Sequence, residues 1–206
     1  MKNLLFILLA FIVGCASTPL ELINEINNVP ESKVYPNELS ALSNNSSRQH
    51  ITENRIDLEF NKSTPLLIVN KKRAPFNVVE LSNNGELLEV STVIKSAGWR
   101  KDAFVLPKIT FSKSNLVIPG PKVKETKIDN FCGLDACLVT IYDLSTIPKG
   151  PYKLLFSAYV ENMNSPLEFR KVDGFYYAGN IPLPISAERA QYATFYGTVK
   201  VKLIKY

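Results

Sequence analysis

The chain has 206 residues, of which 46% are hydrophobic and 21% charged, so it is long and apolar enough to bury the core of one domain. Its formal net charge of +5 is mild, and Lys71, Lys72 and Arg73 form the only basic cluster that stands out. Nucleic-acid-binding proteins carry a denser basic stripe with aromatic residues among it, so the composition argues against a nucleic-acid partner. The cluster itself is typical of a solvated turn beside a strand.

Residues 1–14 have the layout of a secretory signal peptide. A single positive charge, Lys2, precedes a short apolar run from Leu4 to Val13, and the small residue Gly14 follows. The run is shorter than the roughly 20 apolar residues that are needed to span a bilayer. We therefore expect residues 1–14 to direct export and not to form a transmembrane anchor.

The end of this run carries a more specific pattern. Residues 12–15 read Ile-Val-Gly-Cys, which resembles the lipobox of bacterial lipoproteins. The resemblance implies that Cys15 receives a diacylglyceryl group, that the signal is cut before it, and that the new amino end is acylated. Each buried methylene contributes about 0.8 kcal/mol, so several acyl chains hold a protein durably on a membrane. Ala16 and Ser17 resemble the residues that direct lipoproteins to the periplasmic face of the outer membrane, while an ordinary signal peptide cut near them is the alternative.

Residues 15–53 differ in composition from the rest of the chain. Leu20 to Ile26 can form one short amphipathic helix, and two prolines and the Asn- and Ser-rich stretch 44–47 then interrupt regular structure. We expect this segment to be a lipid-anchored tether with a possible short helix. The single histidine, His50, lies in it and is expected to be solvated and without a catalytic role.

From residue 54 onward, short strands alternate with turn signals. The predicted strands cover residues 55–60, 66–69, 76–81, 86–94, 103–106, 109–111, 115–118, 138–142, 152–160 and 197–205. Pro107 indicates a bulge or an edge position between its two neighbours. For residues 185–192, a helical turn or two is the alternative to a strand. Residues 54–206 are thus predicted to form a mainly β domain, an antiparallel β-sandwich of about eight or nine short strands.

Lipidation of Cys15 leaves Cys132 and Cys137 as an even pair. Paired cysteines in an oxidising compartment are usually bridged, and Gly133 and Asp135 between them favour a turn. A disulfide closing so short a loop is expected to stabilise the fold by about 2 kcal/mol. A redox or metal pair is the alternative, but the spacing is not C-x-x-C and no histidine partners are present.

The sequence indicates no catalytic chemistry, so we expect a protein that is not an enzyme and has no metal and no cofactor. With His50 in the tether, serine and cysteine nucleophiles lack a histidine base. No metal-ligand spacing or phosphate-binding glycine loop is present. A catalytic pair of carboxylates, as in glycosidases, is the alternative that the sequence leaves open. Trp99, Tyr176 and Tyr177 are candidates for a ligand-binding surface, with a place in the core as the alternative.

Three stretches resemble the maltose operon periplasmic protein family. Residues 76–92 are similar to its first strand pair, with a glycine turn at Gly85. Residues 103–111 resemble its Val-Phe-x-Pro-x-Val-Leu-Leu-Leu motif, and residues 181–184 followed by 197–203 resemble its closing segment. The resemblance implies an envelope protein of β-sandwich character with a link to carbohydrate uptake, and it carries no catalytic residues.

Together these features predict a non-enzymatic cell-envelope lipoprotein. In the leading hypothesis it is an accessory that binds another protein or a glycan, with a possible link to maltose-type carbohydrate transport. The alternative is an accessory of envelope assembly or secretion, similar to a pilotin, since an exposed sheet edge can accept a partner strand. A hydrolase acting on cell-wall or sugar substrates is the third hypothesis.

Overall fold

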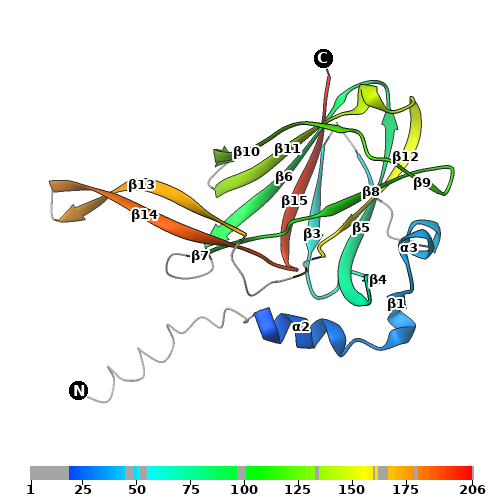
Figure 1. Cartoon of the computed structure of the whole chain (residues 1–206), viewed down its shortest axis with the longest axis horizontal. Coiled ribbons are helices and arrows are strands. Elements are labelled where there is room, and N and C mark those ends of the chain that lie inside the picture. The colour runs from blue at the N-terminus through cyan, green and yellow to red at the C-terminus, as the bar shows by residue number, and fades with distance from the viewer. Residues whose placement is uncertain are drawn as a thin grey trace.

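The computed structural model describes residues 19–44, 49–51, 55–96, 101–132, 135–159, 161, 167–178 and 181–205. The fold is mainly β, with two mixed, open sheets and few helices (Figure 1). Within the described residues, one sheet has seven strands and the other has eight. The prediction of a mainly β, two-layer domain is confirmed. The strands are more numerous than expected, and the sheets are mixed instead of purely antiparallel.

The first sheet is organised around the long strand β5. The strand order is β1 (Val34–Tyr35), β4 (Leu66–Val69), β5 (Lys72–Asn83), β12 (Gly150–Ser157), β8 (Lys108–Lys113) and β9 (Leu116–Ile118). One edge of β5 pairs with β12, while the other is shared by β4 and by the short strand β2 (Gln49–His50). The β1–β4 and β2–β5 pairings are parallel and the others in this sheet are antiparallel.

The second sheet branches at β6. Its main path is β10 (Lys122–Cys132), β11 (Asp135–Asp143), β6 (Leu87–Ser96), β7 (Lys101–Phe104), β14 (Ile181–Ala193) and β13 (Glu168–Ala178). The first half of β6 also pairs with β15 (Gly197–Ile204), which pairs in turn with β3 (Arg55–Phe60). Pro107 therefore lies not in a bulge but between β7 and β8, where the chain crosses from one sheet to the other.

The main core lies between the two sheets, because both present apolar residues at every second position. On β15, Val199, Val201 and Leu203 are buried while Lys202 is exposed, as the alternation in the sequence predicts. The first sheet contributes Val79, Leu81, Phe111, Leu154 and Phe156 to the same cluster. Burial of this apolar surface, at about 25 cal/mol per Å², is the main stabilising term of the fold.

The predicted helix at residues 20–26 is present as α2 (Pro19–Asn27). Leu22 and Ile26, one turn apart on the same face, are buried in the main core. The Arg73 guanidinium donates hydrogen bonds to backbone carbonyls at the end of the helix, including that of Asn27 at 2.9 Å. Lys62 and Glu25 add an exposed ion pair of 2.7 Å. Of the basic cluster, only Lys71 lies in the predicted turn, whereas Lys72 and Arg73 begin β5, and Arg73 also fixes α2.

A second helix, α3 (Glu38–Asn44), packs on the outer face of the first sheet. Its start is capped by Asn37, whose Oδ1 accepts a hydrogen bond of 2.8 Å from the Ser40 backbone N–H. Ala41 and Leu42 are fully buried against residues of β4, β5 and β12. The folded unit therefore includes α2 and α3, and much of the segment predicted as a tether belongs to the domain.

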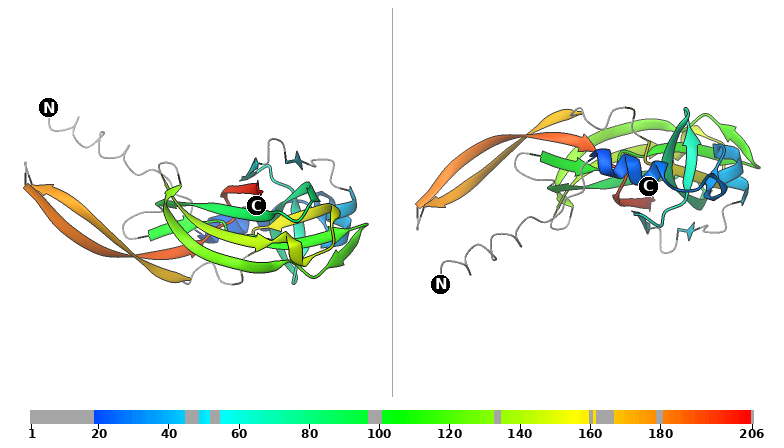
Figure 2. Two further views of the ribbon diagram at one scale, coloured as in Figure 1. Left: turned by 90° about the horizontal axis from the view of Figure 1, so that it is seen from above. Right: turned by 90° about the horizontal axis from the view of Figure 1, so that it is seen from below.

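The strands β13 and β14 form a hairpin, here called the arm, that projects from the body (Figures 1 and 2). Residues 190–193 of β14 pair with β7, whereas residues 181–189 pair only with β13 among the described strands. The predicted helical turn at 185–192 is wrong, because cross-strand pairing along the whole of β14 overrides the local helix preference.

The Cys132–Cys137 disulfide that the sequence predicts is present near the end of the β10–β11 hairpin, with the two Cα atoms 5.7 Å apart. Cys137 is fully buried beside Val93 and Val139 on the face of the second sheet that points away from the main core. The bridge therefore belongs to a small apolar cluster of its own and fixes the end of this hairpin.

Candidate functional site

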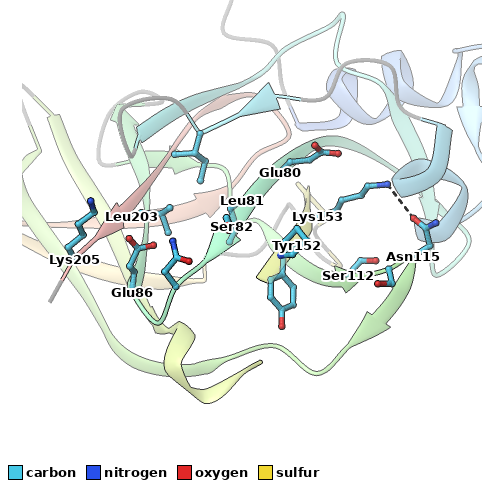
Figure 3. Close-up of a pocket in the computed structure, with 14 residues that line it drawn as sticks. Glu80, Leu81, Ser82, Glu86, Ser112, Asn115, Tyr152, Lys153, Leu203 and Lys205 are labelled. Carbon is cyan, nitrogen blue, oxygen red and sulfur yellow. Dashed lines mark hydrogen bonds between the residues drawn. The ribbon is translucent and has the colours of Figure 1, made fainter. Parts of the chain in front are cut away.

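A cavity of about 690 Å³ opens where the ends of β5, β12 and β15 meet the β8–β9 turn (Figure 3). This volume lies in the usual range of small-molecule sites. The lining combines apolar side chains, hydroxyls, amides and charges of both signs. The lining residues are Ile51, Glu80, Leu81, Ser82, Asn84, Glu86, Ser112, Ser114, Asn115, Pro151, Tyr152, Lys153, Leu203 and Lys205.

The apolar part of the lining comes from Ile51, Leu81 and Leu203, which also pack against the main core. Tyr152 lines the cavity but is only 2% exposed. Its hydroxyl donates to the Pro148 carbonyl, and the Lys113 ammonium lies 5.3 Å from its ring centroid. The ring is therefore committed to the core and does not offer an open face on which a sugar ring stacks.

A polar row crosses the outer face of the first sheet at the cavity. Glu80, Lys153 and Ser112 are direct cross-strand neighbours on β5, β12 and β8. The Lys153 Nζ donates to the Asn115 Oδ1 at 3.3 Å and to the Leu42 carbonyl at 3.4 Å. Asn115 lies in the β8–β9 turn with a positive φ of 62°, a conformation that asparagine tolerates well. The strand register thus brings together groups that lie far apart in the sequence.

Two polar groups of the lining are buried without a hydrogen-bond partner in the part of the chain that the structure describes. These are the Ser112 Oγ and the Glu86 Oε2. Ser112 as a whole is fully buried, with 0% of its surface exposed. An unsatisfied buried polar group costs about 1–3 kcal/mol. A ligand in the cavity is one way to satisfy the Ser112 hydroxyl.

The arm is a second candidate site, for a macromolecule. Its base is fixed by an ion pair of 2.6 Å between the Arg189 Nε on β14 and the Asp102 Oδ1 on β7. The Asp102 side chain is 4% exposed. Beyond this base, residues 174–187 contain no charged residue. The strand register places Tyr176 opposite Leu183 and Tyr177 opposite Pro182 in this uncharged part.

Of the predicted ligand residues, the structure describes the strand positions of Tyr176 and Tyr177. Tyr176 and Tyr177 lie on β13 of the arm and do not line the cavity, while Trp99 and the lipidation candidate Cys15 lie outside the described residues. His50 lies on β2, whose backbone pairs with β5 beside the cavity. No sequence pattern indicates the polar row, because its members are ordinary outward-facing strand residues.

No helix among the described residues is long and apolar enough to cross a membrane. No group of histidine, cysteine, aspartate and glutamate side chains among them is arranged to hold a metal ion.

No family model, curated protein or solved structure matches this chain. The resemblances to bacterial lipoproteins and to the maltose operon family therefore rest on the sequence motifs alone.

Proposed function

We propose that this protein is a non-enzymatic accessory lipoprotein of the cell envelope that binds another envelope protein through the arm. In this proposal Cys15 carries the lipid and holds the protein at the periplasmic face of the outer membrane. The observation that carries the proposal is the projecting hairpin, whose outer residues 181–189 pair only with β13 among the described strands. The lipobox-like residues 12–15 support the location.

The arm differs from an ordinary sheet edge in its composition. Natural proteins protect exposed edge strands with charged residues, lysine above all. The edge strand β10 follows this rule, since Lys122, Lys124 and Lys127 are all exposed. The arm does not follow it, because residues 174–187 carry no charge at all. An isolated two-stranded hairpin is at best marginally stable in water, so a partner that covers it or extends it by a strand gives it a stable environment.

Photo-crosslinking in the native cells tests the partner. A photoreactive phenylalanine in place of Tyr176 should give one discrete protein adduct, and the same group in place of Lys124 on β10 is the matched control. The proposal requires an adduct that is specific to the arm and is competed away by co-expressed unmodified protein. A co-expressed variant whose residues 174–185 are replaced by a two-residue Asn-Gly turn, which keeps Asp173 opposite Ser186, should not compete. Crosslinks to lipid alone would assign the arm to the bilayer, and identical products from both positions would contradict a docking role.

The anchor is tested separately. Cys15→Ser should abolish acyl labelling and release the protein from the membrane fraction. Retention of both would contradict the lipoprotein assignment while leaving the role of the arm intact.

The identity of a crosslinked partner also separates the two processes that the sequence suggests. A subunit of a carbohydrate transporter would favour the link to maltose-type uptake. A subunit of a secretion or surface assembly would favour the accessory role in assembly. The arm fits both processes, because each requires docking to a larger envelope complex.

A further inference from the structure

The cavity at the end of the first sheet combines a buried hydroxyl with no hydrogen-bond partner and a lysine with no ion pair among the described residues. The Ser112 Oγ has no hydrogen-bond partner in the described structure, although the residue is fully buried. Its direct cross-strand neighbour Lys153 is half-buried and forms no ion pair with a described residue. The two hydrogen bonds of the Lys153 Nζ, at 3.3 and 3.4 Å, are long and go to neutral oxygens.

These groups are suited to hold a carboxylate. An ammonium has three donors, so Lys153 keeps one N–H beyond its bonds to Asn115 and Leu42. The Ser112 hydroxyl supplies a second donor from the neighbouring strand. Hydrogen bonds from such groups to an ionised acceptor are shorter and about twice as strong as bonds between neutral groups. A carboxylate would therefore satisfy both groups at once.

Glu80 excludes a simple anion as the best ligand. It is the cross-strand neighbour of Lys153 on the other side and also lines the cavity (Figure 3). Glu80 already has an interaction elsewhere in the chain, but the two oxygens of a carboxylate can accept several hydrogen bonds. A dianion such as phosphate would be repelled at this point, whereas an ammonium group on the same ligand would be attracted.

We propose that the cavity binds a small zwitterion of the class of α-amino acids and short peptides. The ligand carboxylate accepts hydrogen bonds from Lys153 and Ser112, and its ammonium group lies near Glu80. The cavity lining also includes the apolar residues Ile51, Leu81 and Leu203, which pack against the main core. The volume of about 690 Å³ accommodates a peptide of a few residues. A saccharide fits less well, because Tyr152 is buried and offers no stacking face.

Calorimetric titration of the full chain, purified in detergent, tests the ligand class. The probes are glycine, trialanine, trileucine, trialanine amide, N-acetyl-trialanine, inorganic phosphate and maltotriose. We expect at least one of the three zwitterions to bind, the amide to bind at least about tenfold more weakly than trialanine, and the acetylated peptide to be weakened as well. Failure of all three zwitterions to bind, equal binding of the amide, or preferred binding of maltotriose or phosphate would overturn the proposal.

Two variants locate the binding event. Lys153→Met keeps the length of the side chain and should weaken the best zwitterion at least about tenfold, while Ser112→Ala should weaken it about fivefold. Lys202→Met, on the exposed face of β15, is the matched control and should leave binding unchanged. Because Lys153 also contacts α3, thermal unfolding is measured for each variant, and Ser112→Ala decides the result if Lys153→Met does not fold. Unchanged binding in the folded variants would place the ligand elsewhere.

Discussion

The body of the molecule and the arm are built from the same element, the β-strand, but they are stabilised differently. In the body, both sheets bury apolar side chains against each other, and α2 and α3 add buried residues from the N-terminal segment. Among the described residues, the arm is joined to the body at its base, where β14 pairs with β7 and Arg189 contacts Asp102. Packing therefore fixes the body, whereas the position of the arm depends on a few contacts at its base.

Removing a large side chain from the core of the body should destabilise the protein most. Phe156 on β12 is fully buried in the main core, so Phe156→Ala should lower the free energy of unfolding by about 3–5 kcal/mol. Tyr176→Ala in the arm should change it by less than about 0.5 kcal/mol. Urea unfolding followed by tryptophan fluorescence measures both. An equally large loss in the arm variant would mean that the arm packs as a core element.

The second prediction acts on the base of the arm. Asp102→Asn removes the buried carboxylate that the Arg189 guanidinium contacts and should destabilise the base of the arm by about 2–3 kcal/mol. Hydrogen exchange should then become faster in residues 188–193, while the amides of β12 keep their protection. Glu125→Gln, which removes the partner of Lys127 in an exposed ion pair, is the control with a negligible expected effect.

The third prediction concerns the other long hairpin, β10–β11. Replacing both Cys132 and Cys137 by serine should lower the free energy of unfolding by about 2 kcal/mol, because the bridge closes a short loop and Cys137 is buried. Thermal unfolding with and without a reductant measures this loss. The reductant should destabilise the wild type by a similar amount and leave the serine variant unchanged. An effect of reductant on the variant would point to another cause.

The smallest effect is a pH dependence within the body. Burial disfavours the phenolate and raises the pKa of Tyr142 above its usual value of 10.0. Well below pH 10 the phenol is protonated in both the folded and the unfolded chain, so the contribution of Tyr142 to stability is fully present there. As the pH rises, the unfolded chain ionises first, and this stability is lost. Tyr142→Phe should therefore narrow the difference in urea midpoint between pH 8 and pH 11. An unchanged difference would show that Tyr142 titrates as in the unfolded chain.

The sequence predicts best where alternation is strong. The strands at 55–60, 66–69 and 197–204 and the helix α2 follow directly from their apolar periodicity. The strand β10 escapes prediction because its residues 122–127 are exposed on both faces, so no apolar period exists. The docking of α2 and α3 depends on tertiary partners such as Arg73, which local patterns do not contain.

The candidate sites are less predictable than the fold. Glu80, Ser112 and Lys153 come together only through the register of three strands, and the register between distant strands is not encoded in any local motif. The arm is not predictable from the sequence, because residues 185–192 have a local preference for helix that pairing with β13 overrides. The Cys132–Cys137 disulfide is predictable because the two cysteines are separated by a short segment that contains the turn-forming residues Gly133 and Asp135.

The docking of α2 has a consequence for how far the protein reaches from the membrane. Only residues 16–18 separate the proposed lipid on Cys15 from the start of α2 at Pro19. Even when fully extended, the chain from Cys15 to Pro19 spans about 14 Å at roughly 3.5 Å per residue. The start of α2 also lies near the base of the arm in both views (Figures 1 and 2). A lipidated chain would thus lie close against the bilayer. A protein bound by the arm would have to be embedded in that membrane or rest on it.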